Sequence, residues 1–161
     1  VCVDLTTMLD SGEGMLVGSS SGSMVLVHGE TVESEFVPTR PFRVNAGAIH
    51  SYVLMANGKT KYLSELTSGD EVAVLTSSGN QEKATVGRLK VEIRPLLLIR
   101  FEVPSSQGQI VVQQAETVRL ISSDGGAISV TNAKEDDKIF VLADKRARHV
   151  GFALNAEVNE R

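Results

Sequence analysis

The stretch NGKTKYLSELTSGDEVAV at residues 57–74 has a diverged copy, DGGAISVTNAKEDDKIFV, at residues 124–141, an offset of 67 residues. Each copy begins with an Asn-Gly or Asp-Gly turn, passes through a polar turn that ends in aspartate, and closes on an apolar run. Such dipeptides tolerate the positive φ of tight hairpin turns, and the Val- and Ile-containing runs favour strands. Both copies therefore predict one unit of strand, turn, strand, polar turn and strand.

A unit of this kind exposes an apolar face that only a partner can cover. We therefore expect the two copies to pack around a pseudo-twofold axis as a barrel or a sandwich. Asp70 and Asp137, which end the polar turns, are expected to stabilise those turns rather than to act as paired catalytic carboxylates. The predicted fold class is mainly β, made of duplicated β modules with few short helices. The expected organisation is an N-terminal β segment at residues 1–56 and a duplicated β-barrel-like domain at residues 57–161, with repeats at about 57–92 and 124–154.

Short apolar runs separated by turn residues extend this β pattern along the chain. Single turns of helix are expected at Leu5–Asp10 and Leu63–Leu66, where helical spacing is not sustained. Val1–Leu5 resembles the interior of a strand, which suggests a piece of a longer polypeptide. Candidate strands are Met15–Val17, Met24–His28, Ile49–Met55, Glu71–Leu75, Ala84–Glu92, Leu96–Val103, Gln109–Gln113, Thr117–Ile121, Lys138–Leu142 and His149–Leu154.

Composition excludes several classes of function. The net charge of −4 and the pI near 5.4 provide no basic surface, so neither nucleic acid nor a membrane is an expected partner. Aromatic residues make up 4% of the chain, so the core must be aliphatic. The single cysteine, Cys2, excludes an internal disulfide and fits a reducing compartment. No apolar run is as long as a membrane span and no signal peptide is visible, so we expect a soluble intracellular protein.

Residues 39–50, TRPFRVNAGAIH, surround a short apolar stretch with two guanidiniums, an amide, an imidazole and a glycine. Arginine offers a planar fork of donors for a carboxylate or a phosphate, and histidine titrates near neutrality. Arg40, Arg43, Asn45 and His50 are therefore interpreted as an anion-binding site. The alternative is an edge strand whose arginines face water and whose His50 is satisfied in or near the core. The segment by itself does not decide between the two.

The glycines of GEGMLVG at residues 12–18 suggest a dinucleotide-binding fingerprint at first sight. Their spacing is Gly-x-Gly-x-x-x-Gly, and a Ser-rich turn and another strand follow instead of a helix. No helix N-terminus is then available to hold a pyrophosphate. A close backbone approach or a β-bulge explains these glycines equally well.

Seven blocks of sequence carry a resemblance to a known family. They are VCVDL at 1–5, SGEGMLVGSS at 11–20, RPFRVNAG at 40–47 with His50, GKTKYLSEL at 58–66, VGR at 86–88 with Glu92 and Arg94-Pro95, AET at 115–117, and Arg148-His149 with Gly151. Together they resemble the archaeal-type (class II) 3-dehydroquinate synthases, which have relatives in cyanobacteria, plants and algae. The family's proteins are longer, and the chain is similar to their carboxy-terminal half. The resemblance thus implies the N-terminal half of the same polypeptide as a partner.

The resemblance implies NAD-dependent oxidative deamination of 2-amino-3,7-dideoxy-D-threo-hept-6-ulosonate, followed by an aldol closure to 3-dehydroquinate in aromatic amino acid biosynthesis. The substrate carboxylate suits Arg40 or Arg43, and Asn45 could polarise a carbonyl. Removing a hydride from an amine-bearing carbon and enolising a methyl ketone need proton acceptors near neutral pH. His50, Glu13 and His149 are the candidate catalytic residues for that task.

A different class of function remains open: a non-catalytic β module for binding or assembly, attached to a catalytic half elsewhere. Convergence of Arg40, Arg43, Asn45 and His50 on one concavity would favour the enzyme, and a solvated rim would favour the module. No metal site is expected, and the sequence identifies no NAD-binding residues and no oligomeric state. The family implies a cytoplasmic protein, or a plastid protein in a plant or alga.

Overall fold

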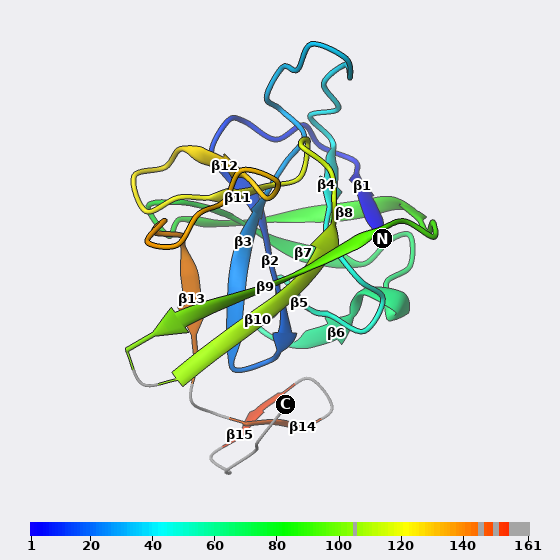
Figure 1. Ribbon diagram of the computed structural model, residues 1–161. Helices are drawn as coiled ribbons and strands as arrows, with labels where there is room; N and C mark the ends of the chain where they lie inside the picture. Colours follow the sequence, from blue (N-terminus) through cyan, green and yellow to red (C-terminus); the bar gives the residue numbers. More distant parts are fainter. Residues whose placement is uncertain (105, 145–146, 150–151, 155–161) are drawn as a thin grey trace.

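The structure is a computed structural model that describes residues 1–104, 106–144, 147–149 and 152–154, the last two ranges by their backbone alone. Strands dominate these residues, and a single turn of 3-10 helix, η1 (Leu63–Glu65), falls in the predicted Leu63–Leu66 stretch (Figure 1). The prediction of a mainly β fold with few short helices is confirmed. The strands are β1 (Cys2–Leu5), β2 (Glu13–Ser20), β3 (Ser23–His28), β4 (Arg43–Asn45), β5 (Tyr52–Leu54), β6 (Thr60–Tyr62), β7 (Glu71–Thr76), β8 (Gln81–Lys90), β9 (Leu96–Val103), β10 (Ser106–Gln113), β11 (Arg119–Ile121), β12 (Ala127–Ser129), β13 (Val141–Ala143), β14 (Ala147–His149) and β15 (Phe152–Leu154).

The repeat found in the sequence is a repeat of backbone pairing. The hairpin of β5 and β6 recurs as the hairpin of β11 and β12, and every residue pair of the first has its counterpart 67 residues later in the second. Asp70 accepts a hydrogen bond from the Thr67 backbone N–H at 2.8 Å, and Asp137 accepts one from the Lys134 N–H at 2.8 Å. Both aspartates therefore serve the polar turns, as predicted.

The antiparallel pair of β2 and β3 lies at the centre of the largest sheet. Strands β5 and β7 of the first repeat pair with β2, and strands β11 and β13 of the second pair with β3. Met15 faces Val74 in the first set, and Val25 faces Val141, 67 residues after position 74, in the second. The predicted pseudo-twofold axis therefore passes between β2 and β3.

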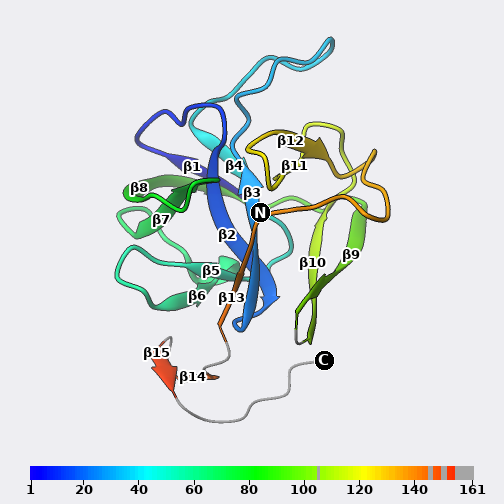
Figure 2. The same cartoon turned by 90° about the vertical axis from the view of Figure 1, so that its left-hand side faces the viewer.

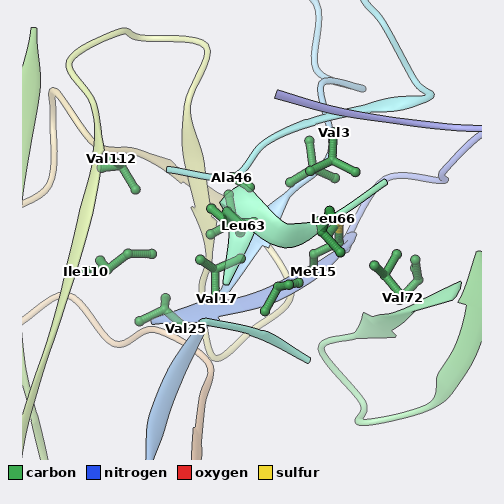
Figure 3. Close-up of a cluster of buried hydrophobic side chains, with 14 of the residues drawn as sticks. Val3, Met15, Val17, Val25, Ala46, Leu63, Leu66, Val72, Ile110 and Val112 are labelled. Carbon is green, nitrogen blue, oxygen red and sulfur yellow. The ribbon is translucent and has the colours of Figure 1, made fainter. Parts of the chain in front are cut away.

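The core is aliphatic, as the composition requires. Val17 and Val25 of the central pair meet Ile110 and Val112 of β10 (Figure 3). Figure 2 shows the hairpin of β9 and β10 on one side of β2 and β3, with β5 to β8 on the other. A smaller apolar cluster, which includes Leu16 and other residues with the opposite side-chain orientation, covers the second face of the central strands.

Four expectations about local structure and domain organisation need correction or remain open. The predicted helical turn at Leu5–Asp10 is wrong, because the N–H groups of Leu5 and Leu9 donate to the carbonyls of Phe42 and Pro41 instead of to a preceding turn. The strand predicted at 149–154 is instead two short strands, β14 and β15, which pair antiparallel to each other. Strands from both sides of position 56 share the large sheet, and the division into two domains there stays a prediction. The end of the second predicted repeat, after residue 144, falls largely outside the described side chains.

The described part of the chain contains no helix long and apolar enough to cross a membrane.

Candidate functional site

Three neighbouring strands, β8, β1 and β4, build the polar site. In this antiparallel arrangement, Asp4 of β1 pairs with Arg43 of β4 on one side and with Arg88 of β8 on the other. Side chains alternate along a strand, so these three residues share one face while Val3 and Val44 point into the core. The predicted Arg43 therefore has two close neighbours, Asp4 and Arg88, that were not predicted as site residues.

The buried carboxylate of Asp4 accepts hydrogen bonds from both Arg43 and Arg88. Arg43 donates from Nε to Asp4 Oδ1 at 2.7 Å and from Nη2 to Asp4 Oδ2 at 3.0 Å. Arg88 donates from Nε and Nη2 to Oδ2 of the same carboxylate, at 2.8 and 2.5 Å. Two guanidiniums share one negative charge, so the group carries a net positive charge. The Asp4 and Arg43 side chains are almost fully covered, whereas the side chain of Arg88 is 65% exposed.

The electrostatics of the group keep it fully ionised at neutral pH. Burial opposes ionisation of Asp4, but hydrogen bonds and charge from Arg43 and Arg88 outweigh it and lower the pKa of the carboxyl below its ordinary value. The hydrogen bonds to Asp4 in turn raise the pKa of Arg43. Burial raises the pKa of the neighbouring Cys2 thiol in spite of Arg43, so Cys2 is a protonated thiol rather than a nucleophile.

A second carboxylate, Glu30, connects Arg40 with this group. Arg40 Nη1 lies 3.5 Å from Glu30 Oε2, and the two residues also form a backbone bridge. Burial raises the pKa of Glu30, although the charges of Arg43 and Arg40 act in the opposite direction. A buried carboxyl group with a raised pKa beside arginines has the properties of a proton acceptor in a reaction at neutral pH. Sequence reasoning missed Glu30, because it lies ten residues from Arg40 and no sequence motif includes it.

The predicted Asn45 follows Arg43 on the same face of β4. Its Nδ2 donates to Oε1 of Gln113 on β10 at 2.8 Å, so the amide joins two sheets. Just beyond it, the Ala48 N–H donates to the Val111 carbonyl at 3.0 Å. The backbone just after Gly47 is thus bonded to β10.

The remaining predicted residues lie apart from the arginine group in their contacts. Glu13 Oε2 accepts a hydrogen bond from the Asp10 N–H at 2.8 Å and so closes its own turn. His50 is an exposed residue in the turn between β4 and β5, and not the core histidine of the alternative interpretation. His149 lies on β14, where its side chain is outside the described residues.

A hollow of about 900 Å³ lies elsewhere on the surface. It is a polar depression over the first repeat, where the rings of Tyr52 and Tyr62 lie 4.8 Å apart and Lys61 is paired with Asp70 at 2.8 Å. Its lining includes none of Arg40, Arg43, Asn45 or His50. These four predicted residues thus lie outside this hollow. We call the face of β8, β1 and β4 that carries Asp4, Arg43 and Arg88 the charged sheet face.

The third histidine, His28, holds the glycine-rich segment in place. It is buried, its Nε2 accepts a hydrogen bond from the Gly12 N–H at 2.9 Å, and its Nδ1 lies 2.6 Å from the Gly29 carbonyl. These partners require a neutral ring with the proton on Nδ1. Burial lowers the pKa of His28, with a smaller contribution from the charge of Arg119, and the Gly29 carbonyl only partly offsets this.

We expect His28 to make the stability of residues 1–161 depend on pH. The folded-state pKa of His28 lies below the ordinary value of 6.5, so the neutral ring makes its full contribution to the free energy of unfolding above pH 6.5. This contribution is lost as pH falls, because the unfolded chain takes up a proton on this histidine before the folded chain does. The slope is at most about 1.4 kcal/mol per pH unit. Urea unfolding from about pH 5 to about pH 7, a range that includes the ordinary histidine pKa, should show this slope. His28→Gln should flatten it and His50→Gln, the exposed control, should keep it. An unchanged slope in His28→Gln would show that another group causes the pH dependence of the stability.

Comparison with known proteins identifies the family. The family described as 3-dehydroquinate synthase II C-terminal domain matches residues 1–161. Over all 161 residues, the chain is 48% identical to 3-dehydroquinate synthase of Methanosphaera stadtmanae and 47% identical to that of Methanocaldococcus jannaschii, in each case covering 45% of the relative. It is 47% identical to 3-dehydroquinate synthase of Methanobrevibacter smithii and covers 44% of it. No solved structure matches the chain.

The chain therefore spans less than half the length of the curated relatives it matches. The whole of it matches the C-terminal domain of the family, which confirms the resemblance to a carboxy-terminal half. Asp4, Arg43 and Arg88 all lie in blocks that carried this resemblance, VCVDL, RPFRVNAG and VGR. This chain belongs to the 3-dehydroquinate synthase II family as its C-terminal domain.

Proposed function

We propose that this domain, within a longer polypeptide, serves a 3-dehydroquinate synthase. The reaction is NAD-dependent oxidative deamination of 2-amino-3,7-dideoxy-D-threo-hept-6-ulosonate, followed by intramolecular aldol closure to 3-dehydroquinate for aromatic amino acid biosynthesis. The observation that carries the proposal is the identity of 47–48% along the entire chain to proteins named 3-dehydroquinate synthase.

The charged sheet face supports a role in substrate binding. The net positive group of Asp4, Arg43 and Arg88 attracts an anion, and the exposed guanidinium of Arg88 retains donors for a substrate carboxylate. Arg40, at the edge of the same group, is a second candidate for that carboxylate. Arg43 already donates to Asp4 from Nε and Nη2. We therefore assign Arg43 to substrate binding through its positive charge and its remaining Nη1 group, and not through a bidentate pair of donors.

Proton transfer in the proposed reaction needs acceptors near this face. The exposed His50 and the carboxylate of Glu13 remain candidates, together with His149, and the buried Glu30 joins them. Glu30 has the advantage of a raised pKa beside Arg40 and Arg43. It would accept a proton more readily at neutral pH than an ordinary glutamate.

The glycine-rich segment at residues 12–18 does not fit NAD. Gly14 and Gly18 lie in β2, where a side chain would collide with the Val27 and Ser23 carbonyls of β3, so these glycines serve the close approach of two strands. The stretch that follows them is another strand and provides no helix N-terminus for a pyrophosphate. No step of the reaction is assigned through NAD to the residues of this domain.

The proposal is tested by NADH formation. The full-length polypeptide that carries this domain should reduce NAD when given the amino-heptulosonate and should release ammonia and 3-dehydroquinate. Residues 1–161 alone should fold but form no NADH, because they hold no recognisable dinucleotide site. The absence of turnover by a folded full-length polypeptide would refute the proposal. Turnover by residues 1–161 alone would refute the expectation that this domain needs the rest of the polypeptide for activity.

One observation favours the second candidate, a non-catalytic β module. The polar residues are largely satisfied inside the fold, with Arg43 bound to Asp4 and Asn45 bound to Gln113. In that case, variants at these residues would change the stability of the protein and leave the kinetics of the remaining folded enzyme near normal.

A further inference from the structure

A stretch of apolar side chains is exposed between β8 and the middle of β9. Ile93 is fully exposed, Val91 is 64% exposed, and Leu96 and Leu98 are each about half exposed. Contiguous apolar surface of this kind is uncommon on an isolated protein and marks a binding surface. We call Val91, Ile93, Leu96 and Leu98 the apolar edge.

The geometry of β9 explains why these leucines face outward. Leu97 and Ile99 pack against the core, so Leu96 and Leu98 lie on the other face of the strand. In the hairpin, Leu96 pairs with Gln113 and Leu98 pairs with Val111 of β10. These four residues therefore share the outer face of the β9–β10 hairpin.

The apolar edge is continuous with the charged sheet face. Gln113, the partner of Leu96, accepts the hydrogen bond from Asn45, which lies on the same face of β4 as Arg43. A protein domain that covers Leu96 and Gln113 would thus also reach the residues around Asp4. Ligand sites often lie between two domains, where each contributes one wall.

The charged residues beside the apolar edge are paired with one another. Glu92 is paired with Lys90 at 2.8 Å and with Arg94 at 2.9 Å. Val91 and Ile93 alternate with these paired charges along the chain. The charges in this stretch thus have partners, while the apolar side chains between them remain exposed.

The apolar edge also lies where a preceding domain would enter. Cys2 pairs with Lys90, so residues 91–94 continue past the beginning of β1 (Figure 1). This chain matches the C-terminal domain of its family and covers 45% of its relatives, so more than half of their length lies in other parts of the polypeptide. The chain ahead of Val1 would emerge beside Val91 and Ile93.

We propose that the N-terminal domain of the same polypeptide docks on the apolar edge. It buries Ile93, Leu96 and Leu98, and its rim extends over Gln113 and Asn45 to the group around Asp4. The charged sheet face then becomes one wall of a cleft between two domains. The docking rests on family membership and on the exposed side chains, and it does not require the proposed reaction.

Photo-cross-linking in the full-length polypeptide tests the docking. The variants Ile93→p-benzoylphenylalanine and Leu98→p-benzoylphenylalanine place a cross-linker on the apolar edge. Phe36→p-benzoylphenylalanine places it at an exposed hydrophobic residue outside that edge, as a matched control. Ile93 is fully exposed, so its replacement leaves the fold intact. After irradiation, peptide mapping should join residues 93 and 98 to residues ahead of Val1, within one chain. The control should give no such cross-link.

Two outcomes would overturn the proposal. Cross-links between two chains, visible as a dimer on a denaturing gel, would assign the apolar edge to a second copy. The absence of cross-links to the N-terminal domain from both positions would mean that the domain docks elsewhere. Neither readout needs NAD or substrate, so failure of the proposed reaction leaves this test unaffected.

Discussion

Replacing Asp4 with asparagine is expected to lower the free energy of unfolding of residues 1–161 by about 3 kcal/mol. The change leaves the covered guanidinium of Arg43 without its charged partner, and it removes the carboxylate to which Arg88 donates. Breaking a buried ion pair from one side is costly, because the remaining charge stays in a poorly solvated place. Urea unfolding of wild type and Asp4→Asn at neutral pH measures the difference.

Glu71→Gln is the matched control for Asp4→Asn. Glu71 forms an ion pair with Lys83 at 2.7 Å, but both side chains are about half exposed or more. Exposed pairs of this kind contribute about 0–1 kcal/mol. Equal losses in the two variants would show that the Asp4 group is no more than a surface contact.

The Asp4 effect also has a defined pH dependence. The folded-state pKa of Asp4 is lowered from 3.8, so the carboxylate stabilises the fold at every pH above 3.8. This stabilisation is lost as pH falls through the lower folded-state pKa. The wild-type protein should therefore lose stability in acid more steeply than Asp4→Asn does.

Much of the fold was predictable because the sequence contains two copies of one structural unit. The Asn57-Gly58 and Asp124-Gly125 turns and the 67-residue offset predicted the repeated hairpins, and the pairing of β5–β6 and β11–β12 confirms them. The central role of β2 and β3 was not predictable from that repeat, because both strands precede it in the sequence. The first turn after Leu5 was also mispredicted, since its N–H groups bond to distant carbonyls that local spacing does not reveal.

The candidate site was predictable only in part. The segment RPFRVNAG identified Arg43 and Asn45, but their partners Asp4, Arg88 and Gln113 are 39, 45 and 68 residues away along the chain. Strand pairing brings them together, and a sequence pattern shows only neighbours. The alternation of VCVDL does place Cys2 and Asp4 on one face of a strand, and an aspartate in an otherwise apolar strand is a signal for a buried partner.

His50→Gln in the full-length enzyme is expected to lower kcat by about 10²–10⁴-fold, the usual effect of losing a general acid or base. It should also alter the pH dependence of the rate, because a general acid or base that takes part in the reaction contributes to that dependence. His50 is exposed in its turn, so the melting temperature should not change. Ile49→Gln, at the neighbouring exposed position, is the matched control and should leave kcat and the pH profile as in wild type.

Steady-state kinetics and thermal melts of the two variants separate the functional role of His50 from a structural one. A loss of kcat with an unchanged melting temperature places the imidazole at the reacting atoms, since no contact of the fold depends on an exposed ring. A wild-type kcat and pH profile in His50→Gln would remove His50 from the chemistry. The buried Glu30 beside Arg40 would then be the first base to test, because burial has already raised its pKa.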